Sequence, residues 1–244
     1  MYELSSKNIQ IILIGYGKMG HAIESLIQKN DLHSIINNED DFKQLCILAS
    51  QNEEFLQNIV IIDFSDGTGC LDRIKTLLGM GSKIISGTTG WNYEFIYENW
   101  NKFPYTTDSA FLHSSNFSIG VNIFWNLIKQ ATKTLSKFNF SATGHEIHHA
   151  EKKDAPSGTA KKTLEIIREH IPNTREFSFE RKGNEKGTHT VSYFTEFEEI
   201  SISHKALSRE IFAKGAIEAG IWISKRKGIF SMSDFLKDYL SLDE

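Results

Sequence analysis

Two histidines, a lysine and a small-residue turn stand close together in the middle of this 244-residue sequence. His148, His149 and Lys152 precede residues 155–159, which read Ala-Pro-Ser-Gly-Thr. The turn predicts a helix start, where free N–H groups and the positive end of the helix dipole bind anions. A lysine suits a carboxylate ligand, and a histidine can transfer a proton near neutral pH. The stretch therefore predicts an anion pocket with a proton donor, and a solvated charged surface is the plain alternative.

The same stretch contains His-Glu-x-x-His at residues 145–149, which is also the ligand pattern of zinc peptidases. Two ligands four positions apart share a face only on a helix. Here Phe138, Phe140 and Ala142 alternate with polar residues, which predicts a strand, and the next helix is expected only after Pro156. We therefore expect no metal site.

A glycine-rich turn follows the apolar run at residues 9–14 and precedes a helical pattern at residues 21–30. Its spacing is Gly-x-Gly-x-x-Gly, which between a strand and a helix predicts dinucleotide binding, because the pyrophosphate must approach backbone N–H groups closely. An ordinary turn is the alternative. The residues expected to bind the cofactor here are Gly15, Tyr16, Gly17, Lys18, Met19 and Gly20.

The residue that contacts the adenosine ribose is expected about 20 positions after the turn and is usually acidic. Asn37 and Asn38 occupy this place, and Glu39 follows them. No arginine stands nearby in the sequence to hold a 2′-phosphate, although Lys18 or Lys43 could partly substitute. The cofactor is expected to be NADH or NADPH, with NADH mildly favoured.

A second small polar loop, residues 86–90, follows another predicted strand. The carboxyl ends of parallel strands line the ligand crevice, so Gly87, Thr88 and Thr89 are candidates to lie against a nicotinamide. An ordinary polar loop explains the pattern equally well.

The first half of the sequence alternates short apolar runs with helical patterns. Such alternation implies right-handed crossovers and a parallel sheet, so the fold class is expected to be α/β with a Rossmann-type N-terminal domain. Strands are predicted at residues 9–14, 33–37, 58–65 and 82–90, with a further possible strand at 45–49, and helices at 21–30 and 70–81.

Beyond Asn116 the pattern changes to a long helix followed by alternating strands. This texture predicts a second, C-terminal α+β domain with a mixed sheet. The helix is expected at residues 120–138, the strands at 139–149, 187–197 and 198–206, and the final segment, 209–240, shows helical periodicity.

Composition excludes several classes of protein. With 27 basic and 31 acidic residues intermixed and a net charge of −4, the chain has no basic field for binding nucleic acid. No apolar run is long enough to span a bilayer, and no signal-peptide pattern is present, so a cytoplasmic protein that does not enter membranes is expected. Cys46 and Cys70 are widely separated in apolar surroundings and are expected to be buried thiols.

The stretch at residues 146–160, Glu-Ile-His-His-Ala-Glu-Lys-Lys-Asp-Ala-Pro-Ser-Gly-Thr-Ala, resembles the signature of the 4-hydroxy-tetrahydrodipicolinate reductases, formerly called dihydrodipicolinate reductases. The resemblance extends over nearly the whole chain, and its blocks follow in the same order. The other matching blocks are residues 15–20, 63–65, 87–90, 115–120, 187–189 and 212–216, together with His204 and Arg209.

The resemblance implies roles for individual residues. His148 is expected to be the catalytic general acid, and Lys152 a second catalytic proton donor. The substrate, a ring with two carboxylates, is expected to be held by the remaining residues of this motif. These substrate-binding residues are His149, Ser157, Gly158 and Thr159. The resemblance also places a second cofactor-binding segment at the hinge between the domains, beside the nicotinamide: Ser115, Asn116, Phe117 and Ser118.

The implied reaction is the NAD(P)H-dependent reduction of (2S,4S)-4-hydroxy-2,3,4,5-tetrahydrodipicolinate, with loss of water, in the diaminopimelate route to lysine. The implied assembly is a homotetramer. The final helices are expected to return to the first domain, which gives a dinucleotide-binding domain at 1–117 and 210–244 and a substrate-binding and tetramerisation domain at 118–209.

Two features depart from the family pattern. Asn37 replaces the acid of the second strand, and the loop at residues 181–189 is short and rich in lysine. The alternatives are another two-domain NAD(P)-dependent dehydrogenase acting on a small anion, which would not need the motif from Lys152 to Thr159, and a cofactor-binding regulator without catalysis.

Overall fold

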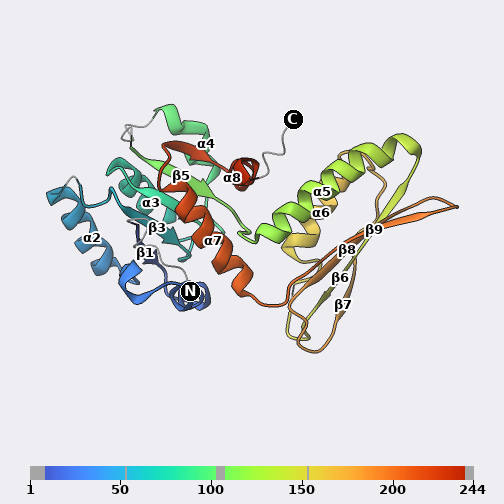
Figure 1. Cartoon of the computed structure of the whole chain (residues 1–244), viewed down its shortest axis with the longest axis horizontal. Coiled ribbons are helices and arrows are strands. Elements are labelled where there is room, and N and C mark those ends of the chain that lie inside the picture. The colour runs from blue at the N-terminus through green and yellow to red at the C-terminus, as the bar shows by residue number, and fades with distance from the viewer. Residues whose placement is uncertain (1–8, 53, 103–107, 153, 240–244) are drawn as a thin grey trace. The chain divides into compact units, whose positions relative to one another are not determined.

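The chain folds into two compact units, each with its own sheet and hydrophobic core (Figure 1). The first unit comprises Met1–Ser118 and Phe212–Glu244, and the second comprises Ile119–Ile211. No helix among the described residues is long and apolar enough to cross a membrane. The residues that this computed structural model describes are 9–52, 54–102, 108–152 and 154–239.

The first unit is built on a six-stranded sheet in which all neighbouring strands are parallel. The strand order is β10-β5-β4-β3-β1-β2, so the chain leaves β1 on one side to form β2 and crosses to the other side to form β3. Open α/β sheets bind ligands at such a reversal, at the carboxyl ends of the strands. The strands are β1 (Gln10–Ile14), β2 (Leu32–Ile36), β3 (Ile59–Asp63), β4 (Lys83–Ser86), β5 (Ala110–His113) and β10 (Gly228–Phe230).

Helices bury the central strands of this sheet, which explains their continuous apolar runs: all five residues of β3 are buried. The last long helix, α7, carries alanines and glycines on its buried side, and a Cβ atom at Gly220 would lie 3.2 Å from Val60. These small residues let the helix lie close to the sheet. The helices of this unit are α1 (Lys18–Leu26), α2 (Glu39–Gln51), α3 (Cys70–Gly79), α4 (Glu94–Asn99), α7 (Glu210–Ile223) and α8 (Met232–Tyr239), with short 3-10 turns at Lys29–Asp31 and Trp100–Lys102.

The prediction of a strand at residues 45–49 is wrong, because this segment lies within helix α2. The Asn38 side chain caps the helix by accepting a hydrogen bond from the Asp41 N–H at 2.9 Å. Leu45 and Ala49, four positions apart, are the buried residues of the helix. The apolar run therefore follows the helical period, and a cap with three acidic residues after it marks the helix start.

Three short strands were not predicted: β5, β10 and, in the second unit, β7 (Ser178–Arg181). Strand β10 interrupts the final segment between α7 and α8, where only helix was expected. It has three residues and pairs with β5, more than 100 positions earlier in the chain. A run this short carries no readable period, so pairing with a distant strand decides its conformation.

The cysteines differ in their burial. Cys70 is buried at the start of α3, as expected, and burial raises the pKa of its thiol well above the usual range. Cys46, on α2, is only partly buried, contrary to the expectation, although burial also raises the pKa of this thiol. Both are free thiols.

The second unit contains a four-stranded mixed sheet of order β7-β6-β8-β9. Strands β6 and β7 are parallel, and the other two pairs are antiparallel. The helices α5 and α6 pack side by side and share a core with the inward side chains of β6 and β8 (Figure 1). The remaining elements are β6 (Ser141–His148), β8 (Thr188–Phe194), β9 (Glu199–Lys205), α5 (Ile119–Leu135), a 3-10 turn (Ser136–Phe138) and α6 (Gly158–Arg168).

Alternation along β6 turns Gly144, Glu146 and His148 toward the buried side of the sheet. Gly144 is needed there because the buried ring of Phe177 fills the space beside it: a Cβ atom at position 144 would lie 1.9 Å from the ring. The glycine therefore lets Phe177 close the core next to the two polar residues.

We predict that Gly144→Ala destabilises the protein by about 1–3 kcal/mol, because the added methyl forces Phe177 or the strand to move in a packed core. Thr143→Ala is the matched control, since Thr143 is the exposed neighbour on the same strand. Chemical denaturation of both variants measures the difference in unfolding free energy. Equal stability of the two variants would contradict the tight packing of Phe177 on Gly144.

Candidate functional site

The glycine turn joins β1 to α1 at the point where the strand order reverses. Gly15 has φ +85°, and a Cβ atom there would lie 2.5 Å from the Phe64 carbonyl oxygen. At Gly20 a Cβ atom would lie 2.7 Å from the Gly15 carbonyl oxygen. Gly17 precedes the helix without a side chain over its first N–H groups, which leaves this helix end suited to a phosphate. Each of the three glycines is thus explained by its own structural requirement: a close backbone contact at Gly15 and at Gly20, and an open helix start at Gly17.

A cavity of about 630 Å³ opens beside this turn at the carboxyl ends of β1, β2 and β3. Asn37 lines it and accepts a hydrogen bond from the Tyr16 N–H at 3.3 Å. The predicted ribose-side residue and the glycine turn are therefore in contact. Glu39, Asp66 and Asp72 also line the cavity and give it negative charge.

Arg73 lines the same cavity, although the sequence analysis found no arginine near Asn37. It comes from α3, distant in sequence, so only the fold brings it here. Its guanidinium already donates hydrogen bonds to the Ser65 hydroxyl at 2.8 Å and to the carbonyl oxygens of Asp66 and Thr68 at 2.8 and 2.7 Å. Arg73 thus braces the loop after β3.

Thr88 lies in a buried network around Asp63, at the carboxyl end of β3. The Asp63 carboxylate accepts hydrogen bonds from the hydroxyls of Ser65 at 2.6 Å, Ser86 at 2.7 Å and Thr88 at 2.9 Å. The Thr88 hydroxyl is therefore engaged in joining two loops. Asp63 was not among the predicted site residues, although an acid at the end of a wholly apolar strand is the signal that could have identified it.

The two neighbours of Thr88 have different surroundings. A Cβ atom at Gly87 would lie 2.0 Å from the Phe64 ring, so this glycine permits close approach of the two loops. Thr89 is exposed. In the segment at 115–118, Phe117 is buried with its ring edge-to-face against Phe64 at 5.8 Å, and Asn116 accepts a hydrogen bond from the Ser118 N–H. Ser115 is exposed.

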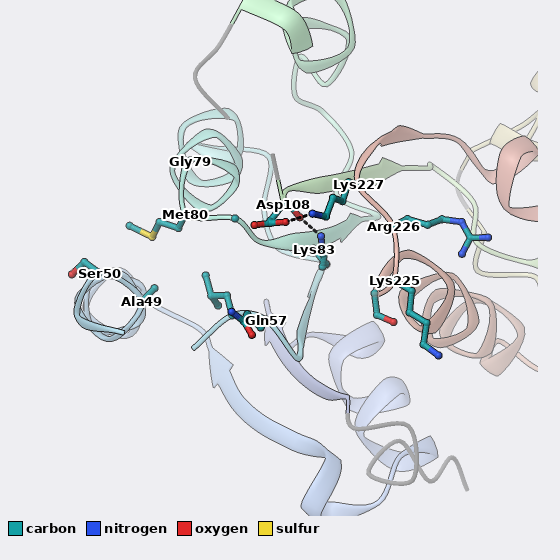
Figure 2. A pocket seen from close by; sticks show the side chains of 13 residues that line it. Ala49, Ser50, Gln57, Gly79, Met80, Lys83, Asp108, Lys225, Arg226 and Lys227 are labelled. Carbon is teal, nitrogen blue, oxygen red and sulfur yellow. Dashed lines mark hydrogen bonds and ion pairs between the residues drawn. The ribbon is translucent and has the colours of Figure 1, made fainter. Parts of the chain in front are cut away.

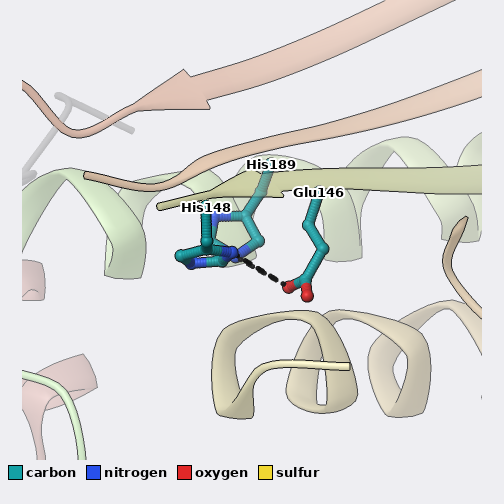
Figure 3. A group of neighbouring side chains, drawn as sticks. All are labelled: Glu146, His148 and His189. Carbon is teal, nitrogen blue, oxygen red and sulfur yellow. Dashed lines mark ion pairs between the residues drawn. The ribbon is translucent and has the colours of Figure 1, made fainter. Parts of the chain in front are cut away.

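In the second unit, three ionisable side chains meet beneath the sheet: Glu146 and His148 of β6 and His189 of β8 (Figure 3). The Glu146 Oε2 atom lies 3.6 Å from His148 Nδ1 and 3.5 Å from His189 Nε2. Glu146 and His189 are directly opposed across the two strands, which explains their proximity. All three side chains are buried.

Glu146 is fully buried and ionised. Its carboxylate accepts hydrogen bonds from Arg181 Nη2 at 3.0 Å and from the Ser157 N–H at 3.1 Å. Burial raises the pKa of Glu146, but hydrogen bonds from His189, Ser157 and Arg181 outweigh this and lower it to about 2. The carboxylate is therefore a fixed negative charge at the start of α6.

His148 is neutral at pH 7 in this arrangement, because burial lowers its pKa to about 4, a shift that the Glu146 charge partly opposes. A buried imidazole of this kind can accept or release a proton when a charged ligand arrives. Lys152 forms an ion pair with Asp154 at 2.7 Å, and the positive charge of Lys152 contributes to lowering the pKa of His148. The structure thus relates the two predicted catalytic residues electrostatically.

The predicted substrate-binding residues lie at the start of α6 and near Arg209. Ser157 caps α6, and its hydroxyl accepts a hydrogen bond from the Ala160 N–H at 3.2 Å and contacts His189 Nε2 at 3.1 Å. Gly158 is exposed and Thr159 is partly buried, both in the first turn of the helix. His149 Nε2 lies 2.9 Å from Arg209 Nη2, so an arginine outside the predicted site stands beside it.

The structural reason given against a zinc-peptidase site is confirmed. His145 lies on strand β6, not on a helix, and its Nδ1 contacts the Ser178 hydroxyl at 2.8 Å. The side chains of Glu146, His148 and His189 have ligand atoms within 4.8 Å of one another. However, Arg181 and the Ser157 N–H already occupy the Glu146 carboxylate, so its burial is explained by protein contacts and no metal site is assigned.

A second hollow of about 710 Å³ lies at the opposite, amino ends of the strands of the first unit (Figure 2). Lys83 begins β4 there, its ammonium contacts the Asp108 carbonyl oxygen, and Lys227 pairs with the Asp108 carboxylate. Because ligands of such sheets bind at the carboxyl ends of the strands, the cavity beside Gly15 is the better candidate ligand site of the two.

Two family models together match most of the chain. A family model described as "Dihydrodipicolinate reductase, N-terminus" matches residues 9–117, and "Dihydrodipicolinate reductase, C-terminus" matches residues 120–236. The 4-hydroxy-tetrahydrodipicolinate reductase of Christiangramia forsetii is 34% identical over 243 residues, which cover 94% of this chain and 98% of the relative. The enzyme of the same name from Buchnera aphidicola subsp. Cinara cedri is 35% identical over 276 residues, which cover 96% and 98%.

A solved structure has the same fold. The dipicolinate-bound dihydrodipicolinate reductase from Paenisporosarcina sp. TG-14 superposes with a TM-score of 0.67 at 18% identity, covering 91% of this chain and 97% of that chain. At this identity the likeness supports the fold alone, but the sequence matches span both units of the chain. The chain is similar over nearly its whole length to the two 4-hydroxy-tetrahydrodipicolinate reductases named above. It therefore belongs to the dihydrodipicolinate reductase family.

Proposed function

We propose that this protein is a cytoplasmic 4-hydroxy-tetrahydrodipicolinate reductase. It reduces (2S,4S)-4-hydroxy-2,3,4,5-tetrahydrodipicolinate with NAD(P)H, with loss of water, in the diaminopimelate route to lysine. The observation that carries the proposal is the buried group of Glu146, His148 and Ser157 at the start of α6, in a chain whose two halves both match this family. The ammonium of Lys152 and the N–H groups of the first turn of α6 suit a ring with two carboxylates.

The residues of the second unit hold the dianion and manage its proton. Lys152 and the first turn of α6 offset the charge of the carboxylates and orient the ring. The reduced nicotinamide, when bound, supplies the hydride. Loss of the 4-hydroxyl and a ring proton as water would leave a conjugated ring that can accept a hydride at C4. The electron pair that this hydride leaves on the ring would be quenched by a proton from His148.

The residues of the first unit would hold the cofactor. The start of α1, which has no side-chain cap, would offer its N–H groups to the pyrophosphate, and Asn37, which lines the cavity, would contact the ribose. The loop after β4, with Gly87, and the segment at 115–118 are proposed to line the nicotinamide.

We predict that His148→Gln lowers kcat by about 100-fold or more while KM for the dicarboxylate changes little, because the proton donor is lost but not the anion pocket. Lys152→Ala should lower kcat and also raise KM. His145→Gln is the matched control, since His145 lies on the same strand and contacts Ser178 instead. Oxidation of NADH and NADPH with enzymatically prepared substrate gives both constants, and an unchanged kcat in the His148 variant would remove this residue from the proposed role.

We propose NADH as the preferred cofactor. Glu39, Asp66 and Asp72 line the adenosine-side cavity, and the guanidinium of Arg73 is already used by the loop after β3. A 2′-phosphate placed near these carboxylates would be repelled.

We therefore predict that kcat/KM for NADH exceeds that for NADPH by about 10-fold, which corresponds to roughly 1.4 kcal/mol. Glu39→Gln should narrow the difference by removing one negative charge, whereas Glu54→Gln, an exposed glutamate that does not line the cavity, should not. Steady-state rates with both cofactors measure the ratio. A preference for NADPH in the unmodified protein would contradict this assignment.

We also propose that the second unit mediates assembly into a homotetramer. Large apolar side chains of this unit are exposed in the single chain, which supports burial against other copies. Those on the sheet and in the segments next to its strands are Phe179, Phe194, Phe197, Ile200 and Leu207.

Light scattering after size-exclusion chromatography is predicted to give a mass four times that of the 27.8 kDa chain. Phe197→Ser should weaken the assembly, because this exposed ring would lose its partner surface. Phe138→Ser is a control from the same unit, outside the sheet. A monomeric mass at micromolar concentration would contradict the proposal.

A further inference from the structure

The carboxylate of Glu146 joins four segments of the second unit. It belongs to β6, faces His189 of β8, accepts a hydrogen bond from Arg181 of β7 and accepts another from the N–H of Ser157, just before α6. The Glu146 side chain is fully buried. A charge kept out of water in this way needs partners on every side, and here the partners are the groups of the proposed substrate pocket.

We infer that Glu146 is a positioning residue that fixes the start of α6 and orients the imidazoles of His148 and His189 toward the bound dicarboxylate. This inference rests on the proposed function and adds to it a residue that does not itself touch the substrate. The Ser157 N–H is shared by the two carboxylate oxygens, at 3.2 Å from Oε1 and 3.1 Å from Oε2. Oε1 also accepts a hydrogen bond from Arg181, and Oε2 also faces the two rings at 3.5 and 3.6 Å.

The contact with Ser157 sets the position of the helix end. The Ser157 N–H donates to Glu146, and the Ser157 hydroxyl accepts from the Ala160 N–H, so the residue is held on both sides. The N–H groups of the first turn of α6 are those expected to meet a substrate carboxylate. Displacing the Glu146 carboxylate would therefore displace this anion-binding end.

The contact with His148 sets the direction of its ring. The Nδ1 atom of His148 is buried, has no hydrogen-bond partner among the described residues and faces Glu146 Oε2. The Nε2 atom lies on the other side, where a Cβ atom at Gly187 would be 3.0 Å away. Glycine at position 187 keeps this side of the ring clear. A proton on Nδ1 would point to the carboxylate and leave Nε2 to serve the substrate.

The charge of Glu146 also favours the protonated ring. Of the groups that act on His148, Glu146 favours protonation, whereas the positive charges nearby oppose it. The titratable and charged groups that face the ring from the surrounding elements are Glu146, His189, Lys152, Arg181 and Glu185. Replacing Glu146 by a neutral amide should therefore make His148 release its proton at a lower pH.

Three variants separate charge from position. Glu146→Gln removes the charge and keeps an oxygen for the Ser157 N–H. Glu146→Asp keeps the charge and withdraws the oxygens by one methylene. Glu180→Gln is the control, because Glu180 lies exposed on the neighbouring strand and its carboxylate pairs with Lys182.

We predict that Glu146→Gln lowers kcat by about 10-fold or more at neutral pH and moves the alkaline limb of the kcat profile down by about one pH unit. Glu146→Asp should lower kcat without moving the alkaline limb of the pH profile. The KM for NADH should stay the same in all variants. Full activity with an unmoved limb in folded Glu146→Gln would overturn the inference. If this variant does not fold, full activity of Glu146→Asp would overturn it.

A second measurement does not depend on turnover. Titration of the His148 ring by NMR, with and without pyridine-2,6-dicarboxylate, should show proton release at lower pH in Glu146→Gln than in the unmodified protein and in Glu180→Gln. Identical titrations in all three proteins would overturn the inference. If the titrations differ in this way but the unmodified protein does not turn over the proposed substrate, the proposed function is contradicted and the role of Glu146 stands.

Discussion

The second unit depends on one constraint: a carboxylate taken wholly out of water must be matched by charges and hydrogen bonds from the protein. Glu146 meets this requirement with Arg181 and the Ser157 N–H. Isolated burial of such a charge would cost several kcal/mol, so any arrangement that separates these groups is strongly disfavoured. The start of α6, the end of β6 and strand β7 are consequently held in one geometry, which would preform the proposed anion-binding end of α6 before a ligand arrives.

The first unit uses the same device with hydroxyl groups in place of a guanidinium. Asp63 ends the buried strand β3, and its carboxylate accepts from Ser65, Ser86 and Thr88. Ser86 ends β4, and Ser65 and Thr88 lie in the loops after β3 and β4, so the acid ties together the edge of the sheet on which a cofactor is proposed to lie. In both units the acid is buried and fixes the segments that are proposed to bind a ligand.

Local patterns in the sequence predicted the elements that local forces determine. The glycine turn, strand β6 and helix α6 each carry their own period or start signal, and all three are found in the structure. The partners of Glu146 could not be predicted, because Arg181 and His189 are 35 and more positions away and reach it only through strand pairing. Arg73 was missed beside Asn37 for the same reason, and the apolar run in α2 was misread because its cap at Asn38 was not weighed.

The low pKa of His148 has a consequence for a reaction that needs a proton donor. Burial lowers the pKa of His148 to about 4 and keeps the ring neutral above this pH. At neutral pH and without substrate, His148 is therefore not in the protonated form that a general acid requires. A substrate with two carboxylates would bring negative charge beside the ring and raise this pKa, as the Glu146 charge already does in part. Proton uptake and substrate binding would then be coupled, because each favours the other. The buried carboxylate would support this coupling, because it faces Nδ1 of the ring and favours the protonated imidazole while the ligand would add a second negative charge.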